Sequence, residues 1–243
     1  MINHVYGNKK IKILKNFKKI IEDLILFILS FFYKFNKSQK IIISSAMYAP
    51  WKDDRFFFNL FSELKDLTII DEARAYTLWY LSKSLKNIEG DIFDVGCMKG
   101  GAGIIMSKAN KNKTTKTYFI DTFDGFVKSY GEHKKKETFV YTKTNELKKN
   151  LNKFKIKNFR IIKTRFPKKF LIKGKIKLCH LDINVYEDTI KSFLFIDKHL
   201  VKNGVIVFDD YGIFKVDGIL NAIKKILKKK YDQKYHVIYN YMG

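Results

Sequence analysis

The sequence predicts an α/β fold, namely a doubly wound, Rossmann-like parallel sheet with helices on both faces, joined to an N-terminal helical appendage. Two observations predict it. From residue 68 onward, short β-rich runs alternate with longer stretches of helical periodicity. Carboxylates follow several of these runs, as expected where parallel strands end at one edge of a sheet. A chain of 243 residues can hold one main domain with an appendage, and we expect these at residues 46–243 and 1–45.

The elements follow one another in the order that a doubly wound sheet needs. Helical spacing of apolar residues predicts helices at Asp71–Leu85 and Gly101–Ala109. Runs rich in β-branched and aromatic residues predict five strands, with a sixth near the end of the chain. The predicted strands are, in order, Asp91–Val95, Thr117–Ile120, Phe159–Ile162, Lys177–Leu181, Gly204–Phe208 and Tyr235–Tyr239.

The appendage begins with a basic stretch and continues with an apolar run from Leu24 to Tyr33. This run is about half of the ~20 residues that a membrane-spanning helix needs. One interpretation is a helix that lies on an anionic membrane surface through residues 10–35, with its lysines among the headgroups. The other is a helix that packs on the domain, or on a second subunit of a homo-oligomer. The basic stretch contains Lys9, Lys10, Lys12, Lys15, Lys18 and Lys19.

The formal net charge of +24 is compatible with a polyanionic partner but does not require one. Almost all of the excess is lysine, spread over most of the chain and accompanied by abundant Asn, Ile, Phe and Tyr. The codons of an AT-rich genome impose this profile, so we expect no nucleic-acid partner. Cys97 and Cys179 lie in or beside apolar runs without metal-binding spacing, which predicts buried free thiols in a reducing, cytoplasmic compartment.

A glycine-rich turn follows the first predicted strand. Gly96, Gly100 and Gly101 would let the backbone approach a ligand closely and open the next helix toward it. Met98 stands where a dinucleotide fingerprint needs its middle glycine, which argues against NAD and FAD. Asp121 ends the second strand about 20 residues later, the distance at which a carboxylate binds ribose hydroxyls. The pattern favours S-adenosylmethionine, which has no pyrophosphate to cradle.

Acidic residues follow the fourth and fifth predicted strands. Asp182 ends the fourth strand, and Asp209 and Asp210 follow the fifth. Carboxylates from neighbouring strand ends suit Mg²⁺, which can lower the pKa of a bound hydroxyl group. The alternative is a cluster without metal that binds the cofactor's amine and the backbone.

Together these motifs resemble the macrocin O-methyltransferase (TylF-type) family of S-adenosylmethionine-dependent sugar O-methyltransferases. The resemblance covers roughly residues 47–240. The matching stretches are Leu67-Thr68, Asp71-Glu72-Ala73-Arg74, Gly90-Asp91-Ile92-Phe93-Asp94-Val95-Gly96, Lys99-Gly100-Gly101, Asp121-Thr122-Phe123-Asp124-Gly125-Phe126, Leu181-Asp182, Tyr186-Glu187, Gly204-Val205 and Asp209-Asp210-Tyr211-Gly212.

The resemblance implies a class I methyltransferase fold and methyl transfer to a hydroxyl group of a sugar, a glycan or a secondary metabolite. It implies that Asp182, Asp209 and Asp210 hold Mg²⁺. It also implies a mobile substrate lid at about residues 124–150. The implied cofactor-binding residues are Thr68, Asp94, Gly96, Gly100, Gly101, Asp121 and Thr122.

Two departures from the family pattern bear on catalysis. The family's proposed general base is an acid two residues after the first metal ligand, and here that position is Asn184. Because an amide takes no proton at neutral pH, the base would be His133 in the lid, His180 or Glu187, or the metal alone would acidify the hydroxyl. In addition, no returning strand follows Tyr235–Tyr239, so the sheet either tolerates a missing C-terminal strand or is destabilised.

Two other functions stay open at this point. A nucleic-acid methyltransferase would suit the positive charge, although the sequence has no Asn-Pro-Pro-Tyr-type base pocket. A membrane-associated protein with a decayed methyltransferase site would account for Asn184 and for the apolar N-terminal run.

Overall fold

The computed structural model describes residues 9–32, 48–124, 142–168, 170, 172, 174–213, 217–228 and 231–239. Contacts divide the chain into two units, Met1–Tyr48 and Ala49–Gly243. The first unit contributes one described helix, α1 (Lys9–Phe32), where the sequence predicts a helical appendage. In the described residues, no helix is long and apolar enough to cross a membrane.

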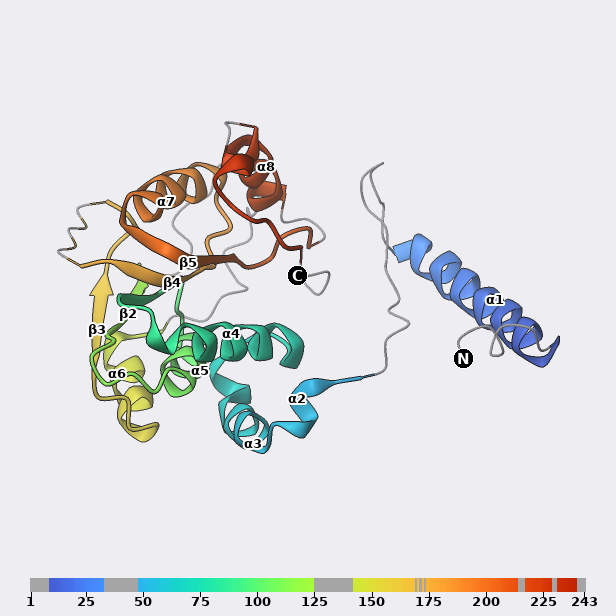
Figure 1. Cartoon of the computed structure of the whole chain (residues 1–243), viewed down its shortest axis with the longest axis horizontal. Helices are drawn as coiled ribbons and strands as arrows, with labels where there is room; N and C mark the ends of the chain where they lie inside the picture. The colour runs from blue at the N-terminus through green and yellow to red at the C-terminus, as the bar shows by residue number, and fades with distance from the viewer. Residues whose placement is uncertain are drawn as a thin grey trace. The chain divides into compact units, whose positions relative to one another are not determined.

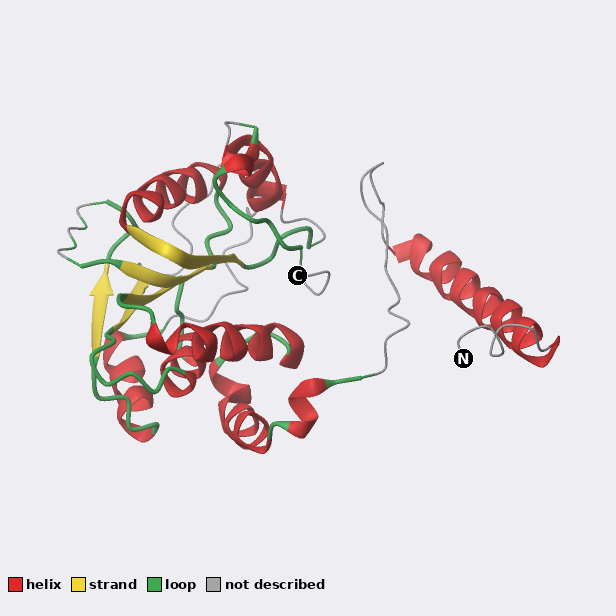
Figure 2. Ribbon diagram, viewed as in Figure 1, coloured by secondary structure: helices red, strands yellow, loops and turns green. Residues whose placement is uncertain are grey.

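The second unit is built on a sheet of five parallel strands, with helices packed against it (Figure 2). The order across the sheet is β3-β2-β1-β4-β5. The strand order therefore reverses between β1 and β4, and a crevice opens there beyond the carboxyl ends of the strands. The predicted doubly wound α/β fold is confirmed. The strands are β1 (Asp91–Val95), β2 (Thr117–Asp121), β3 (Phe159–Lys163), β4 (Ile176–Leu181) and β5 (Leu200–Phe208).

Helices cover both faces of this sheet (Figure 1). Helices α3 to α6 lie on one face, and α7 and α8 lie on the other. The helices are α2 (Pro50–Asp53), α3 (Arg55–Leu64), α4 (Glu72–Ser84), α5 (Gly101–Ala109), α6 (Thr144–Lys153), α7 (Tyr186–His199) and α8 (Asp217–Leu227), with short 3-10 turns at Lys65–Leu67, Leu85–Asn87 and Tyr231–Gln233.

Each face of the sheet has its own hydrophobic core, because neighbouring side chains on a strand point to opposite faces. Ile92, Phe119 and Leu178 pack with the apolar sides of α3 to α6. Phe93 and Tyr118 point to the other face, where their ring centroids lie 4.7 Å apart within a larger aromatic cluster. Strands β1, β2 and β4 are therefore buried along nearly their whole length. Such strands are continuous apolar runs in the sequence, which is why their bounds could be predicted closely.

The prediction of a sixth strand at Tyr235–Tyr239 is wrong, since these residues form no strand. The segment is attached to the rest of the chain by side-chain contacts and not by the backbone hydrogen bonds of a sheet. The Tyr235 hydroxyl donates a hydrogen bond to Asp197 on α7, and the Tyr239 ring packs on Tyr211 at 5.5 Å between centroids. Among the described residues, β5 is consequently an outer strand of the sheet, and its residues are half-buried or exposed.

The segment implied as a lid, residues 124–150, is only partly described. Residues 125–141, which include His133, lie outside the described residues. Thr144–Lys153 forms α6, and its Leu147 and Leu151 are fully buried in the core. A mobile lid thus stays a prediction for the part that precedes α6.

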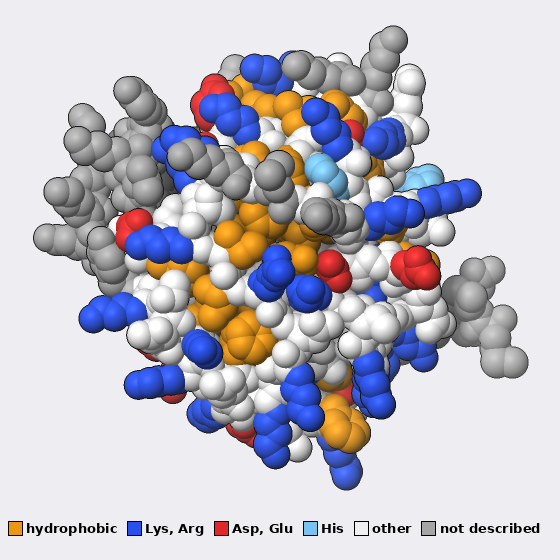
Figure 3. Space-filling model, turned by 90° about the vertical axis from the view of Figure 1, so that its left-hand side faces the viewer, with side chains coloured by type: hydrophobic (Ala, Val, Ile, Leu, Met, Phe, Trp, Pro, Cys, Tyr) orange, Lys and Arg blue, Asp and Glu red, His pale blue; other side chains and the backbone are white. Residues whose placement is uncertain are grey.

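The distribution of basic side chains and the state of the two cysteines can be compared with the sequence analysis. Lys and Arg side chains are scattered over the face drawn in Figure 3, among polar and apolar side chains, and form no single stripe there. Cys97 and Cys179 are free and buried, as predicted, and burial raises the pKa of both thiols well above the usual value.

Candidate active site

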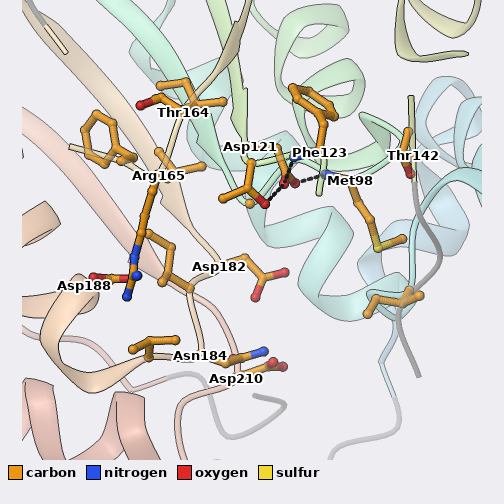
Figure 4. A pocket seen from close by; sticks show the side chains of 18 residues that line it. Met98, Asp121, Phe123, Thr142, Thr164, Arg165, Asp182, Asn184, Asp188 and Asp210 are labelled. Carbon is orange, nitrogen blue, oxygen red and sulfur yellow. Dashed lines mark hydrogen bonds and ion pairs between the residues drawn. The ribbon is translucent and has the colours of Figure 1, made fainter. Parts of the chain in front are cut away.

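A cavity of about 170 Å³ lies at the carboxyl ends of the strands. Segments that follow β1, β2, β3, β4 and β5 all contribute to its walls. Asp121 lines one side, Asp182 and Asn184 line another, and Asp210 lies beside Asn184 (Figure 4). The topology therefore brings together most of the acidic residues that the sequence singled out, as expected for strand ends at a switch point.

The glycine-rich loop between β1 and α5 packs tightly on the chain itself. Gly96 and Gly100 adopt φ angles of +85° and +90°, a backbone region that other residues rarely enter. A Cβ atom on Gly96 would lie 2.0 Å from the carbonyl oxygen of Asp182, and one on Gly101 would lie 2.6 Å from Cβ of Thr68. These glycines are required by protein packing, in addition to any approach of a ligand. Thr68 thereby lies directly against the loop.

Asp121, at the end of β2, is oriented by two backbone N–H groups. Met98 of the glycine loop donates to one carboxylate oxygen at 2.9 Å, and Phe123 donates to the other at 3.0 Å. Two backbone donors, one to each oxygen, fix the direction of the carboxylate. The carboxylate lines the cavity (Figure 4), and Thr122 is a further lining residue. The role of Asp121 in binding the ribose hydroxyls stays a prediction.

Asp94 lies beneath the loop and is fully buried. One of its oxygens accepts a hydrogen bond from the N–H of Gly103 at 2.8 Å, near the N-terminus of α5. The other lies 2.9 Å from Nδ1 of His180 on β4. Both oxygens are therefore engaged within the protein, and Asp94 fixes the position of α5 and of His180 relative to β1.

A chain of charges continues from Asp94 across the crevice. Nε2 of His180 lies 3.7 Å from Asp209. Burial alone would lower the pKa of His180, but the carboxylates of Asp209 and Asp94 raise it to about 10. Burial would raise the pKa of Asp209, whereas His180 and Arg74 lower it to about 2. Arg74 on α4 binds Asp209 at 3.0 Å and Asp210 at 3.2 Å through one nitrogen.

This arrangement does not fit the Mg²⁺ site that the resemblance implies. Arg74 already binds Asp209 and Asp210, two of the three implied ligands. In the part of the chain that the structure describes, no group of three His, Cys, Asp or Glu side chains is placed to hold a metal ion. A divalent cation and the guanidinium of Arg74 would compete for the same two carboxylates, so we assign no step to a metal.

Among the described residues, two buried polar atoms in the cavity wall have no hydrogen-bond partner. They are Oδ1 of Asn184 and Oγ1 of Thr142. The side chain of Asn184 also hydrogen-bonds Asp210 and thereby lowers the pKa of that carboxyl, although burial and Asp209 raise it more. A buried polar atom without a partner costs free energy. Both atoms line the cavity.

Asp182 presents a carboxyl group to the middle of the cavity (Figure 4). Burial, reinforced by the nearby charge of Asp209, raises its pKa to about 8. The other residues that the sequence offers as general bases are less suitable for that role. His180 carries a proton at neutral pH and has a carboxylate near each ring nitrogen. Glu187 is 66 % exposed and faces Lys191 at 3.9 Å. His133 lies outside the described residues.

Sequence reasoning missed two arginines of this region. Arg74 was part of a matching stretch but received no role. Arg165 follows β3, lines the cavity and donates from Nε to Asp188 at 2.7 Å. The available signal was its position directly beyond a strand end, which places a residue at the same crevice as Asp121 and Asp182.

The parallel sheet, the glycine loop and the acid at the end of β2 define a class I methyltransferase fold with a candidate cofactor site. The structure of the O-methyltransferase NovP superposes with a TM-score of 0.61 at 17 % identity, over 71 % of this chain and 78 % of that one. CalS11, a calicheamicin methyltransferase, gives a TM-score of 0.57 at 16 % identity, over 80 % and 91 %. No curated protein matches the sequence.

The model of the macrocin-O-methyltransferase (TylF) family matches residues 67–233. The chain belongs to this family and is an O-methyltransferase. S-adenosylmethionine is the cofactor that membership implies, and the resemblance drawn from the sequence is confirmed.

Proposed function

We propose that this enzyme transfers the methyl group of S-adenosylmethionine to a hydroxyl group of a sugar or sugar-containing metabolite. The observation that carries the proposal is the cavity between Asp121 on one side and Asp182 and Asn184 on the other. The carboxylate of Asp121 would bind the ribose of the cofactor, and the acceptor would lie toward Asp182. Another structure of CalS11 is described as a TDP-rhamnose 3′-O-methyltransferase, which supports a sugar as the acceptor.

The reaction needs a group that takes the proton of the acceptor hydroxyl. The hydroxyl oxygen attacks the methyl carbon, the carbon–sulfur bond of the sulfonium breaks, and a methyl ether and S-adenosylhomocysteine form. We assign the proton to Asp182, because its carboxyl lines the cavity and a pKa near neutrality suits a general base. Asn184 accepts a hydrogen bond from the acceptor through its unpartnered Oδ1 and takes no proton.

Calorimetric titration of the full chain with S-adenosylmethionine tests the first half of the proposal. We expect saturable binding without added divalent cation, and the absence of binding would overturn the proposal. The second half is tested by incubation with S-adenosylmethionine and a panel of nucleotide sugars that includes TDP-rhamnose. We expect mass spectrometry to detect a singly methylated sugar together with S-adenosylhomocysteine. Cofactor binding with no methylated sugar from the panel would count against a nucleotide sugar as the acceptor.

A further inference from the structure

Helix α1 carries a continuous apolar face that is exposed. Eight large hydrophobic side chains on it keep between 40 % and 73 % of their surface accessible. Scattered single hydrophobic residues on a surface are ordinary, but eight on one helix are not. They are Phe17, Ile20, Ile21, Leu24, Ile25, Phe27, Ile28 and Phe31.

The shape of this face distinguishes between possible partners. At about 100° per residue, the eight side chains fall within a single arc of roughly 160° around the helix axis. Lys19 and Asp23 are exposed and fall outside this arc. A pair of helices in a coiled coil buries a narrower seam. An apolar face of about half the circumference, along a helix roughly 36 Å long, is typical of a helix that lies in a membrane interface.

The charge of the helix is also distributed asymmetrically. Its first eleven residues contain six lysines and no acid, whereas residues 20–32 contain Glu22 and Asp23 and no base. The first turn has no acidic residue and the last turn no basic one. Lysines near a helix N-terminus oppose the helix dipole, so this arrangement is unfavourable in water. A surface that presents negative charge to the N-terminal half removes the penalty.

We propose that α1 docks the enzyme on an anionic lipid surface. The helix lies along the boundary between headgroups and acyl chains, with its apolar arc in the lipid and its lysine-rich half among the headgroups. A second copy of the helix fits less well, because the arc is wider than a two-helix seam and a parallel pair would place two lysine-rich halves side by side. Within its described residues, α1 is not long and apolar enough to cross a membrane.

Flotation of the full chain with lipid vesicles tests the proposal. Vesicles of phosphatidylcholine alone are compared with vesicles that also contain phosphatidylglycerol. We expect binding to the anionic vesicles at least about tenfold stronger than to the neutral ones, and weaker binding when salt rises from about 0.1 M to about 1 M. Equal binding to both vesicle types, or binding to neither, would overturn the proposal.

Two variants that leave the charge unchanged distinguish the contribution of the apolar face to vesicle binding from that of the rest of the helix. The double substitution Leu24→Gln and Phe27→Gln should weaken vesicle binding at least about tenfold, because two large side chains no longer bury in lipid. The matched control Asn16→Gln lies outside the arc and should bind like the wild type. If sedimentation shows a dimer that the double substitution abolishes, while vesicle binding is absent, a second copy covers the face instead. These readouts do not depend on methyl transfer, so either proposal can fail without the other.

Discussion

At the residue scale, the site depends on carboxyl groups that differ in how they are held. Asp121 receives two backbone hydrogen bonds, whereas Asp182 is buried near another acid, which raises its pKa to about 8. The first environment fixes the direction of the carboxylate. The second keeps a group that gains and loses a proton near neutral pH, and such contrasts often separate binding from acid–base roles.

Replacing Asp121 with Asn should weaken S-adenosylmethionine binding about tenfold to a hundredfold. The amide loses the negative charge, and a hydrogen bond to a charged group contributes roughly 1.5–3 kcal/mol. Calorimetric titration measures the change. The control is Asp124→Asn, because Asp124 is 55 % exposed and pairs only with Lys163 among the described contacts. Equal loss of affinity in both variants would show that Asp121 has no specific role.

The rate of methyl transfer should rise as the pH increases through about 8, because only the ionised carboxylate of Asp182 can take a proton. Asp182→Asn should lower kcat about 10²–10⁴-fold and remove this dependence, while cofactor affinity changes little. Release of S-adenosylhomocysteine between about pH 6 and pH 9 gives the profile. An unchanged profile in the variant would assign the base to another residue.

At the element scale, the strands are joined at their carboxyl ends by close contacts that leave no spare room. The loop after β1 touches the end of β4 through Gly96 and Asp182. His180 on β4 lies between Asp94 on β1 and Asp209 after β5. Backbone packing and buried charges therefore hold the carboxyl ends of β1, β4 and β5 together.

Gly96→Ala should destabilise the protein by more than Gly212→Ala. Both glycines have a φ of +85°, so both substitutions impose the same left-handed strain of roughly 1–2 kcal/mol. Only at Gly96 does the added Cβ meet a backbone oxygen, at 2.0 Å, while Gly212 has nothing within 4 Å. Urea unfolding of the two variants measures the difference. Similar losses of stability would mean that the loop shifts freely away from β4.

His180 should stabilise the fold in a pH-dependent manner. Its pKa is raised from 6.5 to about 10 in the folded protein, so its stabilising effect is complete below about pH 6.5 and is lost as the pH rises toward 10. His180→Gln should therefore be much less stable than the wild type at pH 6, and the gap should narrow toward pH 10. Denaturant unfolding at several pH values measures this gap. A gap independent of pH would indicate that the imidazole is neutral.

At the scale of the whole molecule, the sequence predicted the sheet better than the site. Strands buried on both faces are continuous apolar runs, so β1 was predicted with its observed bounds and β2 to within one residue. Arg74 and Asp209 are 135 residues apart in the sequence, and no local sequence pattern predicts a contact between such distant residues. Tyr235–Tyr239 looked like a strand because apolar periodicity cannot show whether a neighbouring strand is present to pair with it.

The catalytic unit should fold without the N-terminal helix. The buried residues of both hydrophobic cores lie between Phe57 and Ile196, and the partly buried residues packed on them lie between Trp51 and Phe208, all in the second unit. A chain that begins at Tyr48 should melt within about 2 °C of the full chain, which corresponds to less than ~1 kcal/mol for a domain of this size. Differential scanning calorimetry gives both temperatures. A larger fall would indicate that α1 packs on the catalytic unit.

The walls of the cavity are formed by the ends of several strands. Because Asp121, Asp182 and Asp210 come from the ends of different strands, the cavity exists only while the sheet is intact. A ligand that binds the folded chain alone adds about 2.7 kcal/mol at a hundredfold excess over its Kd. The supply of methyl donor in the cell would then govern how long each enzyme molecule survives proteolysis, as well as how fast it works.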